Sequence, residues 1–288
     1  MKALAWLRST RPASQLYLAL SLAVGWRLAA TAGHPPSTTL LLLLHAYGVA
    51  QQLFIVWAND LADAETDRTN HTPTPFSGGS RVLPLGLLTP AALRSAAIAA
   101  ATVAILLTVA MALRFDAFWS PLFGLAGLLL LQAYSLPPLR LSYRGGGTWL
   151  QVAGLGLHLP LFALYLCGAP LNAATLLPIA LLLPAQFACA IATTLPDEPS
   201  DRASFKRSFT VAHGATATTV AATLALLLSA AGLATTTANR PLLIAAAACA
   251  LKQSLLGRTP PGSNALTLRL FLLVGAALLL QLAVVLGA

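Results

Sequence analysis

The chain of 288 residues has few charged residues, and acidic residues are the scarcest of them. Only 9% of the residues are charged, eight are Asp or Glu, and 57% are apolar. Charged residues make up about 25% of an ordinary soluble domain, so this composition excludes one. The three cysteines, Cys167, Cys189 and Cys249, stand apart in apolar stretches. This spacing excludes a disulfide framework and a zinc site built from paired cysteines.

Long apolar runs are abundant by contrast. A transmembrane helix needs about 17 to 25 mostly apolar residues, and the chain offers a series of such runs. We place transmembrane helices at 14–33, 38–58, 90–113, 117–134, 148–168, 172–194, 215–238, 241–256 and 270–288, of which the eighth is interrupted by Lys252. The sequence therefore predicts an all-α, polytopic membrane protein, a single domain over residues 1–288 with nine transmembrane helices around a central cavity.

The basic residues predict the orientation of this bundle. Lys and Arg are retained on the cytoplasmic side of a membrane. With the N-terminus inside, all of the 17 basic residues except Arg27, Arg114 and Arg240 fall on that side. We expect a multi-pass integral membrane protein of the bacterial inner-membrane type, surrounded by membrane lipids, with a cytoplasmic N-terminus. This topology accounts for the net charge of +9, and no soluble basic domain is left to bind nucleic acid.

Seven of the eight acidic residues occupy two short windows. The first follows the second apolar run and holds Asp60, Asp63, Glu65 and Asp67; the second follows the sixth run and holds Asp197, Glu198 and Asp201. If the second helix continues, its three aspartates lie on one stripe and Glu65 points away into solvent. Pro196 and Pro199 bar a continuous helix through the second window. Both windows fall on the predicted cytoplasmic side, as two related acidic motifs.

Carboxylates at a membrane boundary need cations, because a charge at the bilayer midplane costs about 2.5 to 3.5 kcal/mol on the insertion scale. Oxygen ligands suit magnesium, which usually completes its shell with water and substrate phosphates, and Asn59 adds an amide carbonyl. Arg202, Lys206 and Arg207 directly follow the second window. Metal ions and basic side chains together would stabilise a departing diphosphate. An isoprenoid diphosphate combines such a group with a tail that suits a membrane cavity.

The motifs carry a family resemblance. The stretch NDLADAETD, residues 59–67, resembles the N-D-x-x-D-x-x-x-D signature of the UbiA superfamily of intramembrane prenyltransferases, and Asp197 with Asp201 is similar to its second D-x-x-x-D motif. The stretch AYSLPPLRLSYRGGG, residues 133–147, resembles the Tyr-Ser-x-Pro-Pro loop that follows helix four in that family. The resemblance extends over the whole chain, with motifs after helices two and six.

The resemblance implies a set of site residues. One Mg²⁺ ion would be held by Asp60, Asp63 and Asp67 and another by Asp197 and Asp201, and both would bind the diphosphate of a prenyl donor. The basic residues implied to bind its oxygens are Arg68, Arg81, Arg140, Arg144, Lys206 and Arg207, with Arg81 and Arg144 preferred. Ionisation would leave an allylic cation, which Phe54, Trp57 and Tyr134 are placed to face, since aromatic rings attract cations. Ordinary packing is an equal alternative for Phe54.

The acceptor remains open between alternatives. The stretch FSGGSRVLPLGLL resembles the menaquinone branch of the family, which prenylates 1,4-dihydroxy-2-naphthoate, and so implies an aromatic, quinone-precursor acceptor. The chain differs from that branch at Thr148, Thr193 and Thr194. An intramembrane terpene cyclase of the same superfamily would use the same diphosphate site without an acceptor. A transporter is disfavoured, because transport sites lie near the bilayer midplane and these motifs lie at helix ends.

Polar residues also recur within the apolar runs. His45, Gln52 and Asn59 are spaced by seven on the second helix, as are Gln151 and His158 on the fifth, so each set lies on one helix face. Polar groups inside a membrane usually face the bundle interior. We expect a sparse polar seam along the cavity, in which Gln52 contacts the acceptor or the first isoprene units. Interhelical hydrogen bonds between packed helices are the alternative, and the roles of the two histidines stay open.

Overall fold

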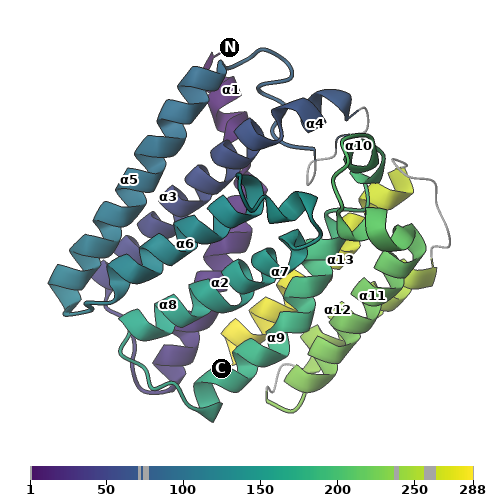
Figure 1. The fold of residues 1–288 in the computed structure, drawn as a ribbon. Helices are drawn as coiled ribbons and strands as arrows, with labels where there is room; N and C mark the ends of the chain where they lie inside the picture. The colour runs from purple at the N-terminus through teal and green to yellow at the C-terminus, as the bar shows by residue number, and fades with distance from the viewer. Residues whose placement is uncertain (1, 71–72, 74–77, 237–239, 256–263, 288) are drawn as a thin grey trace.

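The chain folds into a helical bundle, shown by a computed structural model that describes residues 2–70, 73, 78–236, 240–255 and 264–287. Every regular element in these ranges is helical (Figure 1). The long helices are α2 (Pro12–Thr31), α3 (Thr38–Ala62), α5 (Pro90–Phe115), α6 (Ser120–Ser135), α9 (Ala173–Ala192), α11 (Phe209–Leu233), α12 (Arg240–Leu255) and α13 (Asn264–Gly287). A further long rod is built from α7 (Gly147–Gln151), the π-helix η2 (Val152–His158) and α8 (Leu159–Leu166). The prediction of an all-α polytopic fold is confirmed.

Within the described ranges these nine rods coincide with the nine predicted spans. Five of them, α3, α5, α7–α8, α9 and α11, are long and apolar enough to cross a membrane by themselves. Lys252 does not break α12, because its side chain is exposed on the outside of the helix. Helices α11 and α13 each begin six residues before the predicted start, since hydropathy detects only the apolar part of a helix. Arg269, predicted in a loop, therefore lies inside α13 and is buried.

Local sequence explains where several rods begin. The side chains of Ser37, Thr89 and Asn172 accept hydrogen bonds from the first-turn N–H groups of α3, α5 and α9, which satisfies donors that a helix start leaves unpaired. Pro90 then occupies the first turn of α5, where a missing N–H costs nothing. Polar capping residues therefore fix the N-terminal ends of these three helices.

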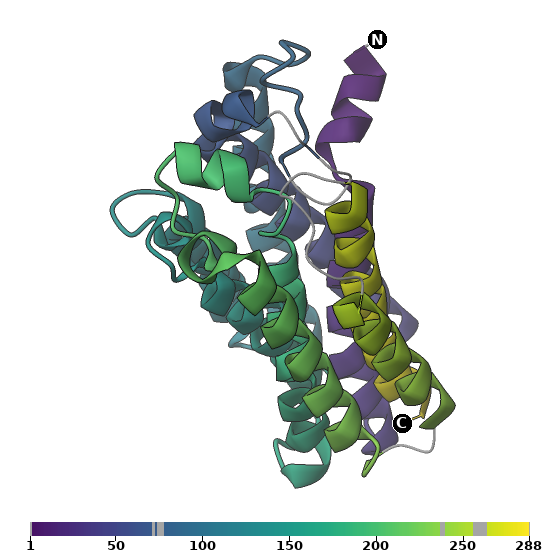
Figure 2. The ribbon, with the colours of Figure 1, turned by 90° about the vertical axis from the view of Figure 1, so that its right-hand side faces the viewer.

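Helix α2 lies between two groups of helices. Figures 1 and 2 show α3, α5 and α6 on one side and α9, α11, α12 and α13 on the other, and α2 contacts α3, α8, α9 and α13. One apolar core joins α9, α11, α12 and α13, and another joins α2, α3, α5 and α8. Close approach of α2 to α8 depends on Gly25, because a Cβ there would overlap the carbonyl oxygen of Pro160.

Three short helices gather at one end of the bundle. They are α1 (Lys2–Ser9), α4 (Ala64–Thr69) and α10 (Glu198–Ala203), and α4 contacts α10 (Figure 1). The short 3-10 turn η1 (Leu141–Tyr143) follows α6 near the same end. Since α4 and α10 carry the two acidic windows, both windows lie together. We call this region the motif end.

Candidate active site

The first acidic motif spans the junction of α3 and α4. Helix α3 ends at Ala62, and Asp63, with φ −98° and ψ 8°, separates it from α4. The second helix therefore does not continue unbroken through the motif, although the N–H of Asp63 still donates to Asn59 and that of Asp67 to Asp63, each over 2.8 Å. Asp60, Asp63 and Asp67 remain buried. Glu65 points into solvent as predicted and pairs with Arg68 at the surface.

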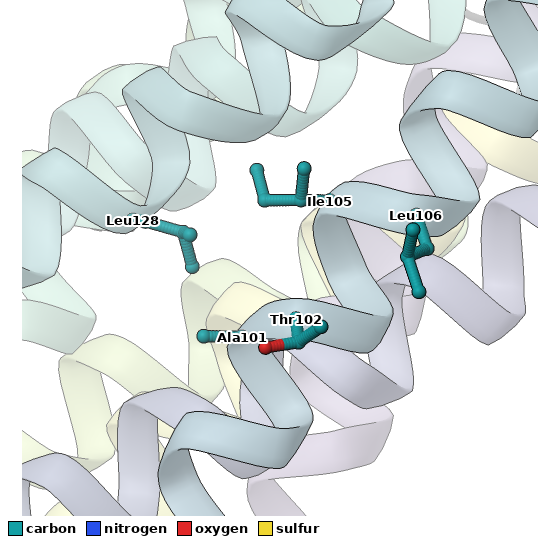
Figure 3. Close-up of a pocket in the computed structure, with 5 residues that line it drawn as sticks. All are labelled: Ala101, Thr102, Ile105, Leu106 and Leu128. Carbon is teal, nitrogen blue, oxygen red and sulfur yellow. The ribbon is translucent and has the colours of Figure 1, made fainter.

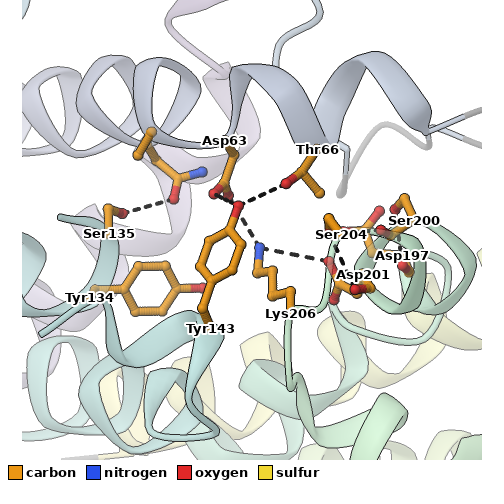
Figure 4. A network of polar contacts seen from close by, with 12 residues as sticks. Asp63, Thr66, Tyr134, Ser135, Tyr143, Asp197, Ser200, Asp201, Ser204 and Lys206 are labelled. Carbon is orange, nitrogen blue, oxygen red and sulfur yellow. Dashed lines mark hydrogen bonds and ion pairs between the residues drawn. The ribbon is translucent and has the colours of Figure 1, made fainter. Parts of the chain in front are cut away.

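Lys206 joins the two acidic motifs. Its Nζ lies 3.2 Å from Asp63 Oδ2 and 3.7 Å from Asp201 Oδ1, and its side chain is mostly buried (Figure 4). Burial alone would lower the pKa of Lys206, but the Asp63 and Asp201 carboxylates outweigh it and hold the pKa well above the usual lysine range. The side chain is therefore a permanent cation. The two acidic motifs therefore meet at one end of the bundle.

Tyr143 supports the same carboxylate from the other side. Its hydroxyl donates to Asp63 Oδ1 over 3.0 Å, and the Thr66 hydroxyl lies 2.7 Å from that phenol oxygen. Because the phenol proton is directed to Asp63, Thr66 is the donor in this second bond. Figure 4 shows Tyr143 standing beside Lys206, which lies 5.3 Å from the centre of its ring. This network fixes the orientation of the Asp63 side chain.

Asp60 is held by residues from outside its own helix. Its carboxylate accepts from the guanidinium of Arg11 and from the hydroxyl of Ser80, and the N–H of Ser80 donates to it over 3.3 Å. Arg11 precedes α2, and Ser80 belongs to the loop between α4 and α5. Two separate parts of the chain, one before α2 and one between α4 and α5, therefore converge on one buried carboxylate.

The glycines before Ser80 bring the loop against both motifs. A Cβ on Gly79 would overlap Asp67 Oδ2, and the N–H of Gly78 donates to Asp197 Oδ2 over 3.3 Å. Asn70 donates to the other oxygen of Asp197 over 3.0 Å. Both glycines have a positive φ, 74° for Gly78 and 69° for Gly79, which glycine adopts at no steric cost.

Two carboxyl groups of the site titrate far from their usual range. Burial, together with the nearby Asp63 carboxylate, raises the pKa of Asp67 to about 7. Burial and the nearby Asp201 carboxylate raise the pKa of Asp197 to about 7. In the described part of the chain, the ion pairs to the five motif aspartates come from Arg11 and Lys206. The site therefore holds more negative charge than its own cations neutralise.

Three arginines at the motif end have left-handed backbones. Their φ values are 46° for Arg11, 65° for Arg81 and 42° for Arg140, a conformation that is uncommon for residues other than glycine. Arg81 donates to the backbone carbonyls of Asp67 and Asn70. Arg140 donates to the carbonyl of Ala62 over 3.4 Å, and its guanidinium lies 3.5 Å from the centre of the Tyr143 ring. All three side chains thus brace the first motif.

The remaining predicted residues take varied positions. Arg68, Arg144 and Arg207 are exposed at the rim. Asn59 accepts a hydrogen bond from Ser135 over 3.1 Å, and Tyr134 accepts one from Gln151 over 3.3 Å. Gln52 is buried in α3.

Trp57 differs from its predicted place. It packs edge-on to Trp6 and donates to Ser9 over 2.9 Å, in the apolar core shared with α1 and α5. This position corrects the expectation that Trp57 faces the substrate.

Sequence reasoning missed several residues that contact the motif aspartates. These are Arg11, Asn70, Ser80 and Tyr143. Tyr143 and Ser80 lie in stretches already singled out, so a search of those stretches for hydroxyl donors would have found them. Arg11 carried only the signal of a basic residue at the start of a span, which topology alone explains.

The donor set fits magnesium. No three His, Cys, Asp or Glu side chains of the described residues converge closely enough to hold an ion alone. Magnesium does not require that, because one or two carboxylates with water and substrate phosphates usually suffice. Burial and neighbouring carboxylates raise the pKa values of Asp67 and Asp197. A cation bound beside these carboxyl groups would favour their ionised form, so the charge of the site suits a metal ion.

Two cavities lie away from the bundle centre. One, of about 320 Å³, opens at the motif end beside the acidic network and is lined by Glu65, Thr66, Thr69, Arg140, Tyr143, Ala203 and Ser204. The other, of about 350 Å³, is an apolar groove between α5 and α6, with Thr102, Ile105 and Leu128 in its lining (Figure 3). Leu106 in this groove is 60% exposed, so the groove lies on the outer surface of the bundle. The predicted central cavity stays a prediction.

Comparison with known proteins adds a family and a fold. The model of the UbiA prenyltransferase family matches residues 18–273 of this chain. No curated protein matches the sequence.

Solved structures resemble the chain over almost its whole length. A UbiA homolog from Archaeoglobus fulgidus bound to DMAPP and Mg²⁺ gives a TM-score of 0.67 at 18% identity, covering 98% of this chain and 99% of that one. A UbiA homolog from Aeropyrum pernix K1 in the apo state gives 0.64 at 17% identity, covering 90% and 96%. A digeranylgeranylglyceryl phosphate synthase gives 0.64 at 16% identity, covering 99% and 98%. At these identities the similarity concerns the fold.

Proposed function

Because the chain belongs to the UbiA prenyltransferase family, we propose that it transfers a prenyl group from an isoprenoid diphosphate to a lipid-soluble acceptor and releases diphosphate. The observation that carries this proposal is the meeting of two buried acidic motifs at one end of an apolar bundle, joined by Lys206. A structural neighbour from Archaeoglobus fulgidus binds DMAPP or GPP together with Mg²⁺, which supports the same pairing of donor and metal here.

The aspartates would hold magnesium in two sets. Asp60, Asp63 and Asp67 form the first set, and Asp197 and Asp201 form the second. Bound magnesium would neutralise charge that builds on the leaving diphosphate. Hydrogen bonds from Arg11 and Ser80 would hold the Asp60 carboxylate in a fixed orientation, and one from Tyr143 would hold that of Asp63.

Lys206 would act directly on the diphosphate. Its ammonium group already lies between the two motifs, and a lysine provides three rotatable donors on a flexible stem. With Asp63 and Asp201 serving as metal ligands, the same ammonium group would be free to donate to diphosphate oxygens. Arg81 and Arg140 contact backbone carbonyls instead, so we assign them the support of the first motif.

The prenyl tail would occupy the apolar interior below the motif end. Tyr134 is the aromatic side chain of the predicted set that lies beside the network around Lys206 (Figure 4), and its ring face would stabilise an allylic cation. The distribution of basic residues supports a motif end that faces the cytoplasm. The prenyl donor would then bind from the aqueous, cytoplasmic side, with its hydrocarbon tail extending into the part of the bundle that lies in the membrane.

We propose an aromatic, quinone-precursor acceptor. The support is the Gly-Gly-Ser-Arg loop, which resembles the menaquinone branch and whose residues Gly78, Gly79 and Ser80 contact both motifs. The alternative is a terpene cyclase that uses the same donor site without an acceptor.

Turnover in nanodiscs tests these assignments. The protein would be incubated with Mg²⁺ and labelled geranyl diphosphate, with and without 1,4-dihydroxy-2-naphthoate. Formation of prenylated naphthoate in the presence of the acceptor supports the proposal. Formation of a cyclic hydrocarbon without the acceptor supports the terpene cyclase. If no diphosphate is released in either reaction, both functions are rejected.

Asp67→Asn should lower the rate about a hundredfold or more, since electrostatic stabilisation of this kind contributes about 10² to 10³ in rate. The matched control is Glu65→Gln, which removes an exposed carboxylate from the same helix. An equal loss in both variants would reject the assignment of Asp67.

A further inference from the structure

A second polar cluster lies deep in the bundle, remote from the aspartates. Its members are Tyr47 and Gln51 of α3 and His158 of η2. A Cβ placed on Gly127 of α6 would lie closest to Gln51 Nε2, and 2.9 Å from His158 Nε2 and 3.1 Å from the Tyr47 hydroxyl. Two helical segments, α3 and η2, therefore bring three polar groups against α6, and glycine at position 127 leaves the room for them.

One polar atom of each of these side chains has no hydrogen-bond partner within the described part of the chain. The Tyr47 hydroxyl, Gln51 Oε1 and His158 Nε2 are all buried without a hydrogen bond. Tyr47 is 0% exposed and Gln51 is 3% exposed. A buried polar group left unpaired costs about 1 to 3 kcal/mol. Such a cost at three neighbouring groups indicates that an oxygen atom from outside the chain satisfies them.

The distances suit a single oxygen. The Tyr47 hydroxyl and His158 Nε2 both lie about 3 Å from the position of a Cβ on residue 127, so these two atoms are no more than about 6 Å apart. That separation is within the span of a single oxygen that makes two hydrogen bonds of about 3 Å each, placed beside the α6 backbone. The Gln51 side chain borders the same position. All three side chains are neutral hydrogen-bonding groups, and the described residues around them supply aromatic rings. The cluster therefore suits a hydroxyl or carbonyl oxygen and not an anion.

The surroundings indicate that this oxygen belongs to an aromatic or otherwise apolar molecule. Phe162 packs against Tyr47 with ring centres 5.1 Å apart, and Phe123 lies 5.9 Å from His158. His158 ends a π-helix, a rare form that is frequent at functional sites. Pro160 has no N–H for the carbonyl of Gly156, which favours the irregular turn. At Gly154, four residues before His158, a side chain would meet open space.

The depth of the cluster separates it from the diphosphate. Gln51 precedes Asp60 by nine residues, which is about 14 Å along a helix. A prenyl tail is hydrocarbon and satisfies none of these groups, whereas an acceptor carries oxygen. We propose that Tyr47, Gln51 and His158 form a binding site for the hydroxyl or carbonyl oxygen of the lipid-soluble acceptor. This inference rests on the proposed function for the identity of the ligand, but not for the existence of the site.

Binding of a probe without donor or metal tests the site. Affinities of 1-naphthol and naphthalene would be measured in nanodiscs and corrected for partition into empty nanodiscs. We expect the protein to bind 1-naphthol about tenfold more tightly, because a buried hydrogen bond contributes about 1 to 1.5 kcal/mol. Tyr47→Phe should reduce this ratio towards one. Tyr165→Phe is the matched control, since Tyr165 belongs to the same aromatic stack but accepts a hydrogen bond from Trp119.

A second pair of variants blocks the site without removing a polar group. Gly127→Ala should also abolish the preference for 1-naphthol, and Gly275→Ala, whose Cβ meets no atom within 4 Å, should retain it. If Gly127→Ala fails to fold, Gln51→Leu replaces it in the comparison.

The outcomes separate this inference from the proposed function. An equal ratio in the wild type and Tyr47→Phe overturns the site and assigns the cluster to bound water or to packing alone. A protein that prefers 1-naphthol through Tyr47 but releases no diphosphate from geranyl diphosphate keeps the site and overturns the proposed function. A protein that turns over the donor without this preference keeps the function and overturns the site.

Discussion

Lys206 and Asp63 form an ion pair across the two acidic motifs, with Nζ 3.2 Å from Oδ2. The two residues are separated by 143 positions in sequence, and their segments also meet where α4 contacts α10. The pair places a cation where the proposed magnesium and diphosphate would lie. In the metal-free protein it therefore holds together carboxylates that would otherwise repel each other.

Removal of this cation should make folding depend on metal. Lys206→Met leaves Asp63 and Asp201 without their counter-charge, and loss of one partner of a buried pair costs about 3 to 5 kcal/mol; protonation of the carboxyls would relieve part of that cost. We expect a lower unfolding temperature without metal and a smaller deficit at saturating Mg²⁺. Lys206→Arg should retain most of the stability. Arg207→Met, at the exposed neighbour, is the control, and an equal effect there would contradict a specific role for Lys206.

Magnesium binding should weaken as the pH falls through 7. The pKa of Asp67 and of Asp197 is about 7 in the metal-free protein, whereas an aspartate is ordinarily ionised well below that pH. Magnesium binds the ionised form, so protons compete with it below pH 7. Between pH 8 and pH 6 we expect the affinity to fall about tenfold for each such carboxyl, as measured by calorimetry. Asp67→Asn should show a shallower dependence, and an unchanged slope would speak against proton competition at Asp67.

Alanine substitutions at Gly79 and Gly86 should distinguish the effect of a steric clash with Asp67 from the effect of backbone strain alone. Gly79 and Gly86 have φ values of 69° and 64°, so alanine strains both backbones by about 1 kcal/mol or more. Only at Gly79 would the new Cβ displace Asp67, because the one at Gly86 meets open space. Gly79→Ala should lose most magnesium affinity and turnover, while Gly86→Ala should lose only thermal stability. Normal magnesium binding by Gly79→Ala would show that the loop moves without Asp67.

Packing of α2 on α8 should tolerate no added methyl group. In Gly25→Ala the new Cβ would overlap the backbone oxygen of Pro160, which cannot rotate away as a side chain does. Overpacking of this kind costs about 1 to 3 kcal/mol. We expect a lower unfolding temperature for Gly25→Ala than for Gly275→Ala, which adds the same methyl group in open space. Equal temperatures would mean that the two helices separate at little cost.

Much of the architecture was predictable because membrane spans follow from apolar length. The nine predicted spans match rods of the structure, and the errors lie at their ends. Arg269 was placed outside a span because a charge is assumed to end one, yet the helix continues past it. The junction at Asp63 was missed because spacing on an ideal helix carries no information about a local change in φ and ψ.

The candidate site was predictable only in its charges. The five aspartates stand out against a chain with eight acidic residues, but their partners do not. Arg11 reaches Asp60 across 49 positions, and no local pattern encodes a contact over that separation. Trp57 was misplaced for the related reason that an aromatic residue near a motif packs as readily against α1 as against a substrate.

The left-handed arginines limit which substitutions could make this protein more stable to heat. Glycine adopts the backbone conformation of Arg11, Arg81 and Arg140 without strain, so a glycine variant would relieve about 1 kcal/mol of backbone strain at each position. The same exchange removes the guanidinium groups that donate hydrogen bonds to the first motif. At Arg11 it also leaves the buried Asp60 carboxylate without its ion-pair partner, a loss of about 3 to 5 kcal/mol that outweighs the relief of strain. Backbone geometry alone would therefore select the wrong positions for engineering heat stability in this protein.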